Sequence, residues 1–408
     1  MAGKISTRAA YGEALVELAE QYPELVVLDA DLANATMTKG FAAKYPERFF
    51  DMGIAECNMT GVAAGLSTCG FKPFTDTFAI FATGRAWEQV RNSVAYPHLN
   101  VKIVGSHGGL SVGEDGATHQ SVEDLALMRV IPGMKVLCPC DGNEMKLAVK
   151  ALLDYEGPAY LRLGRAAVET VTDEIEGYRF ELDKGATLAD GKDVTVIATG
   201  MMVQLALKAR ETMAAEGVSV RVIDMHTIKP LDTELVLRAA QETGCIVTSE
   251  EHSVIGGLGG AVAEFLAENC PTPVVRHGVN DEFGRSSAYP KKAPVVDRSF
   301  QTIGGLTVMA LKDEWKKTGQ ELGDAFTGLG KSLVRTAKVG ADMTQNWAED
   351  RDPHEGIPQQ NVTNDGSWQK TGRRMGDALE QLGKTVLHTA KTGAKKVENW
   401  AEQDEKKE

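Results

Sequence analysis

The sequence predicts an α/β protein with two parallel or mixed sheets, followed by an amphipathic helical tail. Two observations indicate this. Short apolar runs alternate with segments of helical periodicity over most of the chain, and the last part of the chain contains an internal repeat. Strands that alternate with helices form a parallel sheet covered on both faces. With 408 residues, 43% of them hydrophobic and 25% charged, the chain can bury the cores of two or three domains.

Residues 1–170 form the first predicted domain. Buried strands are indicated by three apolar runs, at 25–28, 101–104 and 160–163. Apolar residues recur every three or four positions in two further segments, 54–68 and 143–155, as in helices that pack on a sheet.

A second, smaller α/β domain is predicted at 185–306, after a polar connection at about 171–192. Its strand-like runs are at 194–198, 220–223 and 245–248. Its helical segments are at about 201–216, 232–243 and 260–268.

The tail, residues 310–408, is predicted to form two amphipathic helices. The segment 315–349 aligns with 368–402 at a constant offset of 53, and 19 of the 35 aligned pairs are identical. In each copy the apolar residues fall on one stripe of a helix, and a breaker segment with two prolines separates the copies. Two interpretations stay open: the helices pack on each other or on the body of the protein, or they attach the chain to a partner or a membrane surface.

Charge and cysteine content exclude several classes of function. A net charge of −13 argues against nucleic-acid binding, which needs a concentrated basic surface. No apolar stretch approaches the ~20 residues that span a bilayer, and the N-terminus does not resemble a signal peptide. The six cysteines are scattered, and Cys138-Pro139-Cys140 lacks the spacing of a zinc site. We therefore expect a cytoplasmic protein with reduced thiols.

Two short segments carry residues that suit a cofactor site. Glu56 falls in the first turn of a predicted helix, and Phe78 and Phe81 are three positions apart after an apolar run. Taken alone, the glutamate would offset the helix dipole and the phenylalanines would fill a core.

The loop 105–120 is the most informative segment. It follows a predicted strand directly and holds His107, Asp115 and His119 among several glycines. Ligands bind at the carboxyl ends of parallel strands, so a functional role is favoured over a structural one. A zinc site made of these three residues is an alternative, but no i, i+4 histidine pair on a helix supports it. We expect no metal ligand in this chain.

Residues 1 to about 306 resemble the C-terminal half of transketolase, a thiamine-diphosphate enzyme. The resemblance is greatest to the free-standing C-terminal subunit of the split, two-gene form. The segments that carry it are Ser6–Arg8, Leu28–Leu32, Gly53–Glu56, Ser106–Gln120, Leu161–Arg165, His226–Leu231 and Glu251–Gly257.

The resemblance implies a thiamine-diphosphate pyrimidine-binding domain at 1–170 and a transketolase C-terminal domain at 185–306. The family's diphosphate-binding domain, whose Gly-Asp-Gly motif holds Mg²⁺, has no counterpart in the sequence. The chain is therefore expected to be half of an enzyme. It would work with a transketolase N-terminal subunit, in a hetero-oligomer such as an α2β2 tetramer. Thiamine diphosphate would lie across the interface, with its diphosphate and Mg²⁺ held mainly by the partner.

The implied reaction is transfer of a two-carbon ketol unit from a ketose, expected to be a sugar phosphate, to an aldose. By resemblance, Glu56 hydrogen-bonds the N1′ nitrogen of the pyrimidine and so promotes the proton transfer that activates the cofactor. Phe78 and Phe81 match the aromatic residues that flank the pyrimidine ring.

The same resemblance assigns the substrate side. His107 and His119 match histidines that contact sugar oxygens, and histidines can move protons near neutral pH. Asp115 matches the aspartate that binds the C2 hydroxyl of the acceptor. Arg165 and Arg8 match arginines that bind the substrate phosphate.

Three positions depart from the family pattern. Cys57 stands where glutamine is common, and Gly84 stands where some members have a tyrosine that contacts the cofactor. The usual phosphate-binding serine is missing, and Thr36 is the candidate replacement. Alternative interpretations are a subunit of the 2-oxo-acid dehydrogenase beta or deoxyxylulose-phosphate synthase type, and a non-catalytic scaffold that acts through the tail. The histidines and aspartate of the 105–120 loop favour sugar transfer.

Overall fold

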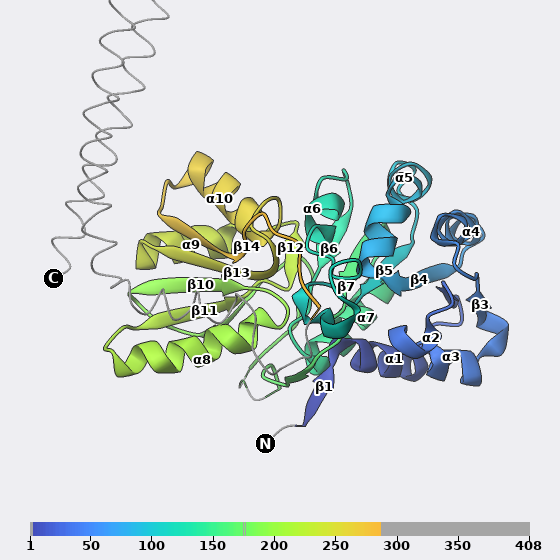
Figure 1. The fold of residues 1–408 in the computed structure, drawn as a ribbon, viewed down its shortest axis with the longest axis horizontal. Coiled ribbons are helices and arrows are strands. Elements are labelled where there is room, and N and C mark those ends of the chain that lie inside the picture. The colour runs from blue at the N-terminus through green and yellow to red at the C-terminus, as the bar shows by residue number, and fades with distance from the viewer. Residues whose placement is uncertain (1–2, 174, 176, 287–408) are drawn as a thin grey trace, which may run out of the picture. The chain divides into compact units, whose positions relative to one another are not determined.

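A seven-stranded sheet organises the N-terminal part of the protein (Figure 1). The computed structural model describes residues 3–173, 175 and 177–286, so the predicted tail lies outside the described residues. Across the sheet the strands are β12 (Thr227–Lys229), β6 (Lys135–Leu137), β7 (Ala159–Arg162), β5 (Lys102–Ser106), β4 (Lys72–Phe78), β2 (Leu25–Asp29) and β3 (Phe49–Asp51). All pairs are parallel except β12 with β6.

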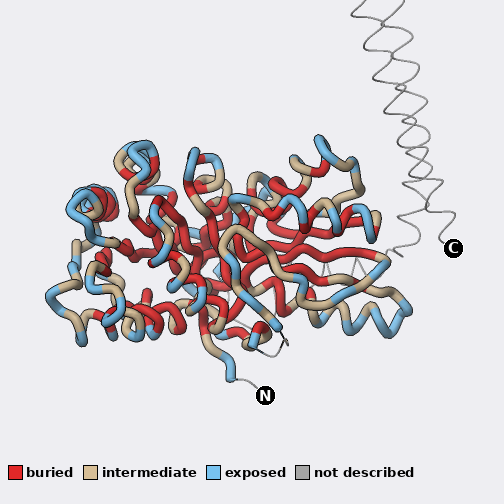
Figure 2. Tube along the Cα trace, turned by 180° about the vertical axis from the view of Figure 1, so that it is seen from behind, coloured by how far each residue is buried: buried red, intermediate tan, exposed pale blue. Residues whose placement is uncertain are grey.

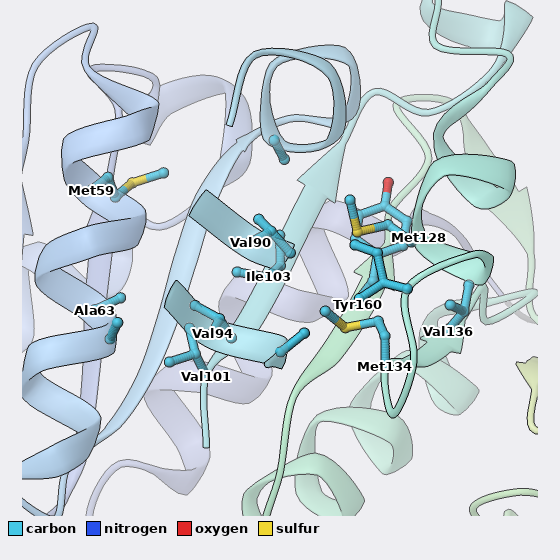
Figure 3. Close-up of a cluster of buried hydrophobic side chains, with 14 of the residues drawn as sticks. Met59, Ala63, Val90, Val94, Val101, Ile103, Met128, Met134, Val136 and Tyr160 are labelled. Atoms are coloured by element: carbon cyan, nitrogen blue, oxygen red, sulfur yellow. The ribbon is translucent and has the colours of Figure 1, made fainter. Parts of the chain in front are cut away.

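Helices cover both faces of this sheet, as a parallel sheet requires. One face carries α4 (Glu56–Thr68), the π-helical segments Phe81–Arg85 and Val90–Ala95 on either side of α5 (Trp87–Gln89), and α6 (Asp124–Arg129). Side chains such as Met59, Val90 and Ile103 form the apolar core beneath them (Figure 3). The other face carries α1 (Thr7–Leu18), α3 (Lys39–Lys44) and α7 (Gly142–Asp154). A short helix, α2 (Ala33–Thr36), follows β2, and β1 (Lys4–Ser6) pairs with β8 (Ala167–Glu169).

A five-stranded sheet organises the second part. Its strands, in order across the sheet, are β14 (Val274–Val279), β13 (Ile246–Ser253), β10 (Val194–Ala198), β11 (Val220–Asp224) and β9 (Ala186–Ala189). Only β9 runs antiparallel to its neighbour. Helix α8 (Met202–Ala215) packs on one face, and α9 (Thr233–Thr243) and α10 (Leu258–Asn269) pack on the other. The prediction of an α/β fold with two mixed sheets is confirmed.

Local signals explain where the main helices begin. The side chains of Ser6, Asp141 and Asp232 each accept a backbone N–H of the first turn of α1, α7 and α9. Such caps are worth about 1 kcal/mol each. Strands β2, β5, β7 and β10 are buried along their whole length, as expected for strands covered on both faces (Figure 2). Within the described part of the chain, every helix is too short or too polar to cross a bilayer.

The two parts of the protein make direct contacts in addition to the chain segment that connects them. Strand β12 belongs by sequence to the second part, yet it pairs with β6 of the first sheet. Close to this connection, Asp224 at the end of β11 lies beside Glu144 of α7, and both side chains are buried. Tyr178 and the backbone N–H of Cys140 donate to the Glu144 carboxylate. Burial and the neighbouring Glu144 raise the pKa of Asp224 well above its usual value.

Asp224 should therefore make stability pH-dependent. Its native pKa lies above its unfolded value, so the stability it contributes is complete below about pH 3.8 and is lost as the pH rises through the native pKa. Asp224→Asn cannot ionise. We expect the melting temperature of the wild type to fall between pH 5 and pH 9 by about 2–4 °C more than that of the variant. Thermal unfolding of the full chain at both pH values measures this, with the exposed Asp281→Asn as control. Parallel pH profiles for wild type and Asp224→Asn would contradict the assignment.

Candidate active site

The candidate active site lies at the carboxyl edge of the seven-stranded sheet. Strands β2, β3, β4, β5 and β7 are parallel, so their ends meet at one edge. Glu56 follows β3, Phe78 ends β4 and His107 follows β5. Arg165 follows β7, and Arg8 stands in the first turn of α1. Ligands bind at this edge in open α/β sheets.

Glu56 is the first residue of α4, and its side chain is almost completely buried. One guanidinium nitrogen of Arg85, Nη1, donates to both of its carboxylate oxygens, at 2.9 and 2.8 Å. A buried carboxylate is strongly disfavoured without such a partner, so Arg85 compensates its charge. Nearly half of the Arg85 side chain is exposed. The neighbouring thiol of Cys57 donates to the Arg85 carbonyl, at 3.4 Å.

Aromatic rings connect this carboxylate to the histidines. The guanidinium of Arg85 lies over the ring of Phe81, 4.5 Å from its centre. The rings of Phe81 and Phe78 are nearly parallel, with centres 6.0 Å apart. The ring of His107 stacks on Phe78 at 4.0 Å, and His119 meets both phenylalanines edge-on, at 5.8 and 5.5 Å. Glu56, the two phenylalanines and the two histidines thus belong to one continuous cluster.

His107 is held as a neutral ring. Arg8 Nη1 lies 3.3 Å from His107 Nε2, and because arginine only donates, Nε2 accepts. His107 Nδ1 then carries the proton and donates to Ser106 Oγ, at 2.9 Å. Burial, together with the charges of Arg8 and Arg165, lowers the pKa of His107 to about 3. This lowered pKa disfavours the predicted exchange of protons by His107 near neutral pH, and we expect its ring to act as a neutral hydrogen-bonding group.

The backbone at His107 is also unusual. Its φ of 59° lies in the left-handed region, which costs a non-glycine residue about 1–2 kcal/mol. Such conformations persist where surrounding contacts impose them, and they cluster at functional sites. Here the contacts with Phe78, Arg8 and Ser106 hold the ring in place.

The rest of the loop brings the other predicted residues together. Arg165 lies 3.7 Å from the carboxylate of Asp115 and donates to the carbonyl of Val112. Asp115 is exposed, and His119 is half-buried with its Nδ1 2.8 Å from Thr118 Oγ1. Arg8 also donates to the carbonyl of Ala35, at 2.7 Å. All the predicted site residues therefore lie at this edge of the sheet.

One candidate residue does not fit its expected role. Thr36 is buried, and its hydroxyl donates to Asp29 at 2.7 Å. Its hydroxyl is thus engaged within the protein, which disfavours Thr36 as the candidate replacement for the missing serine. Gly84 is exposed, and the side chain of Ile80 lies 3.9 Å from a Cβ placed there, so a larger side chain at this position would have room.

Sequence reasoning missed Arg85. Its contact with Glu56 spans 29 positions in the chain. The available signal was its spacing from Phe81 by four residues, which places both on one helical face.

Among the described residues, one group has the composition of a metal site: Cys140, Glu144 and Asp224. Both Glu144 oxygens already accept hydrogen bonds, from the backbone N–H of Cys140 and the hydroxyl of Tyr178. Burial and the neighbouring Glu144 raise the pKa of Asp224, which favours its protonated form over a metal-binding carboxylate. This group belongs to the junction of the sheets and not to the loop that carries His107.

Fold and site define a two-sheet α/β subunit whose ligand edge offers a buried carboxylate, parallel aromatic rings and a polar, histidine-bearing loop. The family model "Transketolase, pyrimidine binding domain" matches residues 3–170, and "Transketolase, C-terminal domain" matches residues 183–295. The chain belongs to the transketolase family, whose members are transferases that use thiamine diphosphate.

Individual relatives agree. A Methanocaldococcus jannaschii protein described as a transketolase C-terminal section is 47% identical over 76% of this chain and 96% of its own length. A 6-deoxy-6-sulfo-D-fructose transketolase subunit of Clostridium sp. is 47% identical over 68% of this chain and 85% of its own. A split-gene transketolase solved as an inactive β4 tetramer is 51% identical, covers 75% of this chain and 99% of its own, and superposes with a TM-score of 0.68.

The neutral state of His107 can be measured directly. In ¹⁵N-detected NMR of the histidine rings, we expect His107 to stay neutral from pH 8 down to pH 5, because its pKa is held at about 3. An ordinary histidine titrates near pH 6.5. Arg8→Ala removes one cause of the lowered pKa and should raise the midpoint, and a missing signal in His107→Gln assigns the resonance. A wild-type midpoint between pH 6 and pH 7 would show that the ring is not held neutral.

Proposed function

We propose that the chain is the C-terminal subunit of a split transketolase. In this proposal it transfers a two-carbon ketol unit from a ketose to an aldose, together with a separate N-terminal subunit. The observation that carries the proposal is the continuous cluster from Glu56 through Arg85, Phe81 and Phe78 to His107. It places a buried carboxylate, aromatic rings and neutral hydrogen-bonding groups at one edge of the sheet.

The cofactor side suits a pyrimidine. When bound, thiamine diphosphate supplies the nucleophilic carbon for making and breaking a carbon–carbon bond. Glu56 would accept a hydrogen bond from the ring nitrogen N1′ when that nitrogen carries a proton, and would so favour the protonated ring. A carboxylate has about four lone-pair sites, so it can keep Arg85 as a partner at the same time. Phe78 and Phe81 would flank the ring, and burial of the carboxylate strengthens its electrostatic effect on the bound base.

The substrate side suits an anionic sugar. His107 would orient a sugar hydroxyl as a neutral donor or acceptor, and the half-buried His119 is the better candidate for moving a proton. Asp115 would accept the acceptor's C2 hydroxyl. The charges of Arg8 and Arg165 both lower the pKa of His107, so both arginines lie near its ring. Their forked cations suit a substrate phosphate.

The outer face of α4 suits a partner subunit. Most of its exposed residues are small or apolar, namely Cys57, Gly61, Val62 and Gly65, beside the polar Asn58 and Thr68. Ile54, just before this helix, is 76% exposed. The apolar face begins at Glu56, so a subunit seated on it would also cover the cofactor edge. We propose that this partner is the N-terminal subunit, that it holds Mg²⁺ and the diphosphate, and that the assembly is an α2β2 tetramer.

We also propose that the enzyme works in the cytoplasm. Cys57 and Cys69 are exposed free thiols in the structure, and Cys138 and Cys140 are buried free thiols. Free thiols persist in a reducing compartment.

The role of Glu56 is tested by Glu56→Gln in the complex assembled with a candidate N-terminal subunit. The amide keeps the shape but loses the charge, so turnover should fall by about a hundredfold or more. Steady-state ketol transfer measures the loss, and circular dichroism checks the fold. Glu88→Gln, at an exposed position of α5, is the control. Undiminished turnover in Glu56→Gln would refute the role.

The partner surface is tested by Val62→Glu. The new carboxylate would be buried unpaired in the subunit interface, so affinity for the N-terminal subunit should fall by about tenfold or more. Isothermal titration calorimetry measures the affinity. Leu147→Glu is a matched control, because Leu147 is 37% exposed against 38% for Val62 and lies on α7, across the sheet from α4. Equal affinity for both variants would place the interface elsewhere.

A further inference from the structure

The substrate-binding loop is fastened to the second sheet by one carboxylate. Glu251 of β13 reaches the loop 105–120 from the other part of the molecule. Its two oxygens accept the backbone N–H and the hydroxyl of Ser111, the latter at 3.2 Å. Ser111 stands between His107 and Asp115 in the chain, so this contact lies at the middle of the segment that carries the substrate-binding groups.

The loop backbone packs directly against this side chain. At Gly109, where φ is +83°, a Cβ atom would overlap the carboxyl group of Glu251. A left-handed conformation and such a close approach both require glycine. Gly109 thus lets the loop pass over the carboxylate with no side chain between them.

Glu251 is itself anchored through its backbone. Its carbonyl accepts a hydrogen bond from Arg162 Nη2, at 2.9 Å. Arg162, at the end of β7, is buried and paired with Asp124 of α6 at 2.7 Å. Nearby, the N–H of Ser253 donates to the carbonyl of Val122, at 2.8 Å. Strand β13 is therefore fixed against the first sheet, and Glu251 extends from a rigid base.

A small cavity lies beside the carboxylate. It measures about 20 Å³, and its lining includes Ser111, Cys138, Arg162 and Glu251. A volume of this size admits one water molecule. The carboxyl group therefore has room to change its hydrogen bonding without displacing the sheet.

We propose that Glu251 is a positioning residue of the transferase, which holds the loop bearing His107, Asp115 and His119 in its substrate-binding conformation. This rests on the proposed function, since it assumes that the loop binds sugar. It also assigns a task to the second sheet, which supplies no group to the cluster around Glu56. Glu251 touches neither cofactor nor substrate in this account; it acts through Ser111.

The contact between Glu251 and Ser111 should depend on pH. Burial raises the pKa of Glu251 to about 7, against the opposing effects of Arg162 and the Ser111 hydrogen bonds. The charged and titratable groups that face it are Arg162 from β7, Asp124 behind Arg162, and the Cys138 thiol across the cavity. Above about pH 7 the carboxylate is ionised and accepts charge-assisted bonds, which are stronger than neutral ones. Below that pH the protonated form holds Ser111 less tightly.

The test compares wild type with Glu251→Gln, whose neutral amide resembles the protonated acid at every pH. The first readout is hydrogen–deuterium exchange of the 105–120 segment in the full chain, measured at pH 6 and pH 8. We expect the variant to exchange faster than wild type at pH 8, by about fivefold, and the two to converge at pH 6. This readout needs no turnover, so it tests whether Glu251 holds the loop even if the proposed function fails.

The second readout is ketol transfer by the assembled enzyme. KM for the ketose should rise about fivefold in Glu251→Gln at pH 8, with a smaller change in kcat and a converging KM at pH 6. Ser111→Ala removes only the hydroxyl, so it should raise the exchange rate and KM as Glu251→Gln does, but by less. It replaces Glu251→Gln as the test variant if that variant does not fold.

Glu250→Gln is the matched control. Glu250 is the preceding buried glutamate of β13, but it accepts from Leu258 and Gly259 of α10, within the second sheet's own helix layer. It should leave the exchange of the 105–120 segment and KM unchanged. The proposal is overturned if Glu251→Gln matches wild type at pH 8 in both readouts, or if Glu250→Gln changes them equally.

Discussion

A carboxylate buried at the start of a helix needs a compensating charge, and Glu56 finds it in Arg85. The two are linked through both carboxylate oxygens, and Arg85 in turn lies over the ring of Phe81. Without this ion pair, the buried carboxylate would carry an uncompensated desolvation cost. The aromatic rings and the histidines are arranged around this pair. In this cluster the ion pair and the ring contacts follow one another, so each side chain is held in place by its neighbour.

The second sheet acts on this unit from outside. Its strand β13 contacts the first part through the Arg162 hydrogen bond to the Glu251 carbonyl and through the contact of the Glu251 carboxylate with the loop. They fix the loop that carries His107 without adding a group to the cluster around Glu56. The same loop is held at its far end, where Gln120 donates to the carbonyl of Arg285 at 3.1 Å. A loop rich in glycine has many alternative conformations, so contacts of this kind are needed to select one.

Much of this structure could be predicted from local patterns in the sequence. The strands around 25–28, 101–104 and 194–198 were predictable because buried parallel strands are short, largely apolar runs. Phe78 and His107 could be identified because they end or follow a buried strand, and Glu56 because it opens a helix; all three stand in motifs that resemble a family. The roles of Arg85 and Glu251 could not be predicted, since their contacts join residues 29 and 140 positions apart. The neutral state of His107 was also hidden, because it depends on burial and on Arg8, 99 positions away. Periodicity is a local property and does not encode such pairings.

The most direct examination of this account is a crystal structure of the chain assembled with its N-terminal subunit and thiamine diphosphate. The account predicts that a Glu56 carboxylate oxygen lies within about 2.6–3.2 Å of the pyrimidine N1′ nitrogen. The ring should rest against Phe78 and Phe81. A pyrimidine seated at another edge of the sheet, with Glu56 still occupied by Arg85 alone, would contradict it.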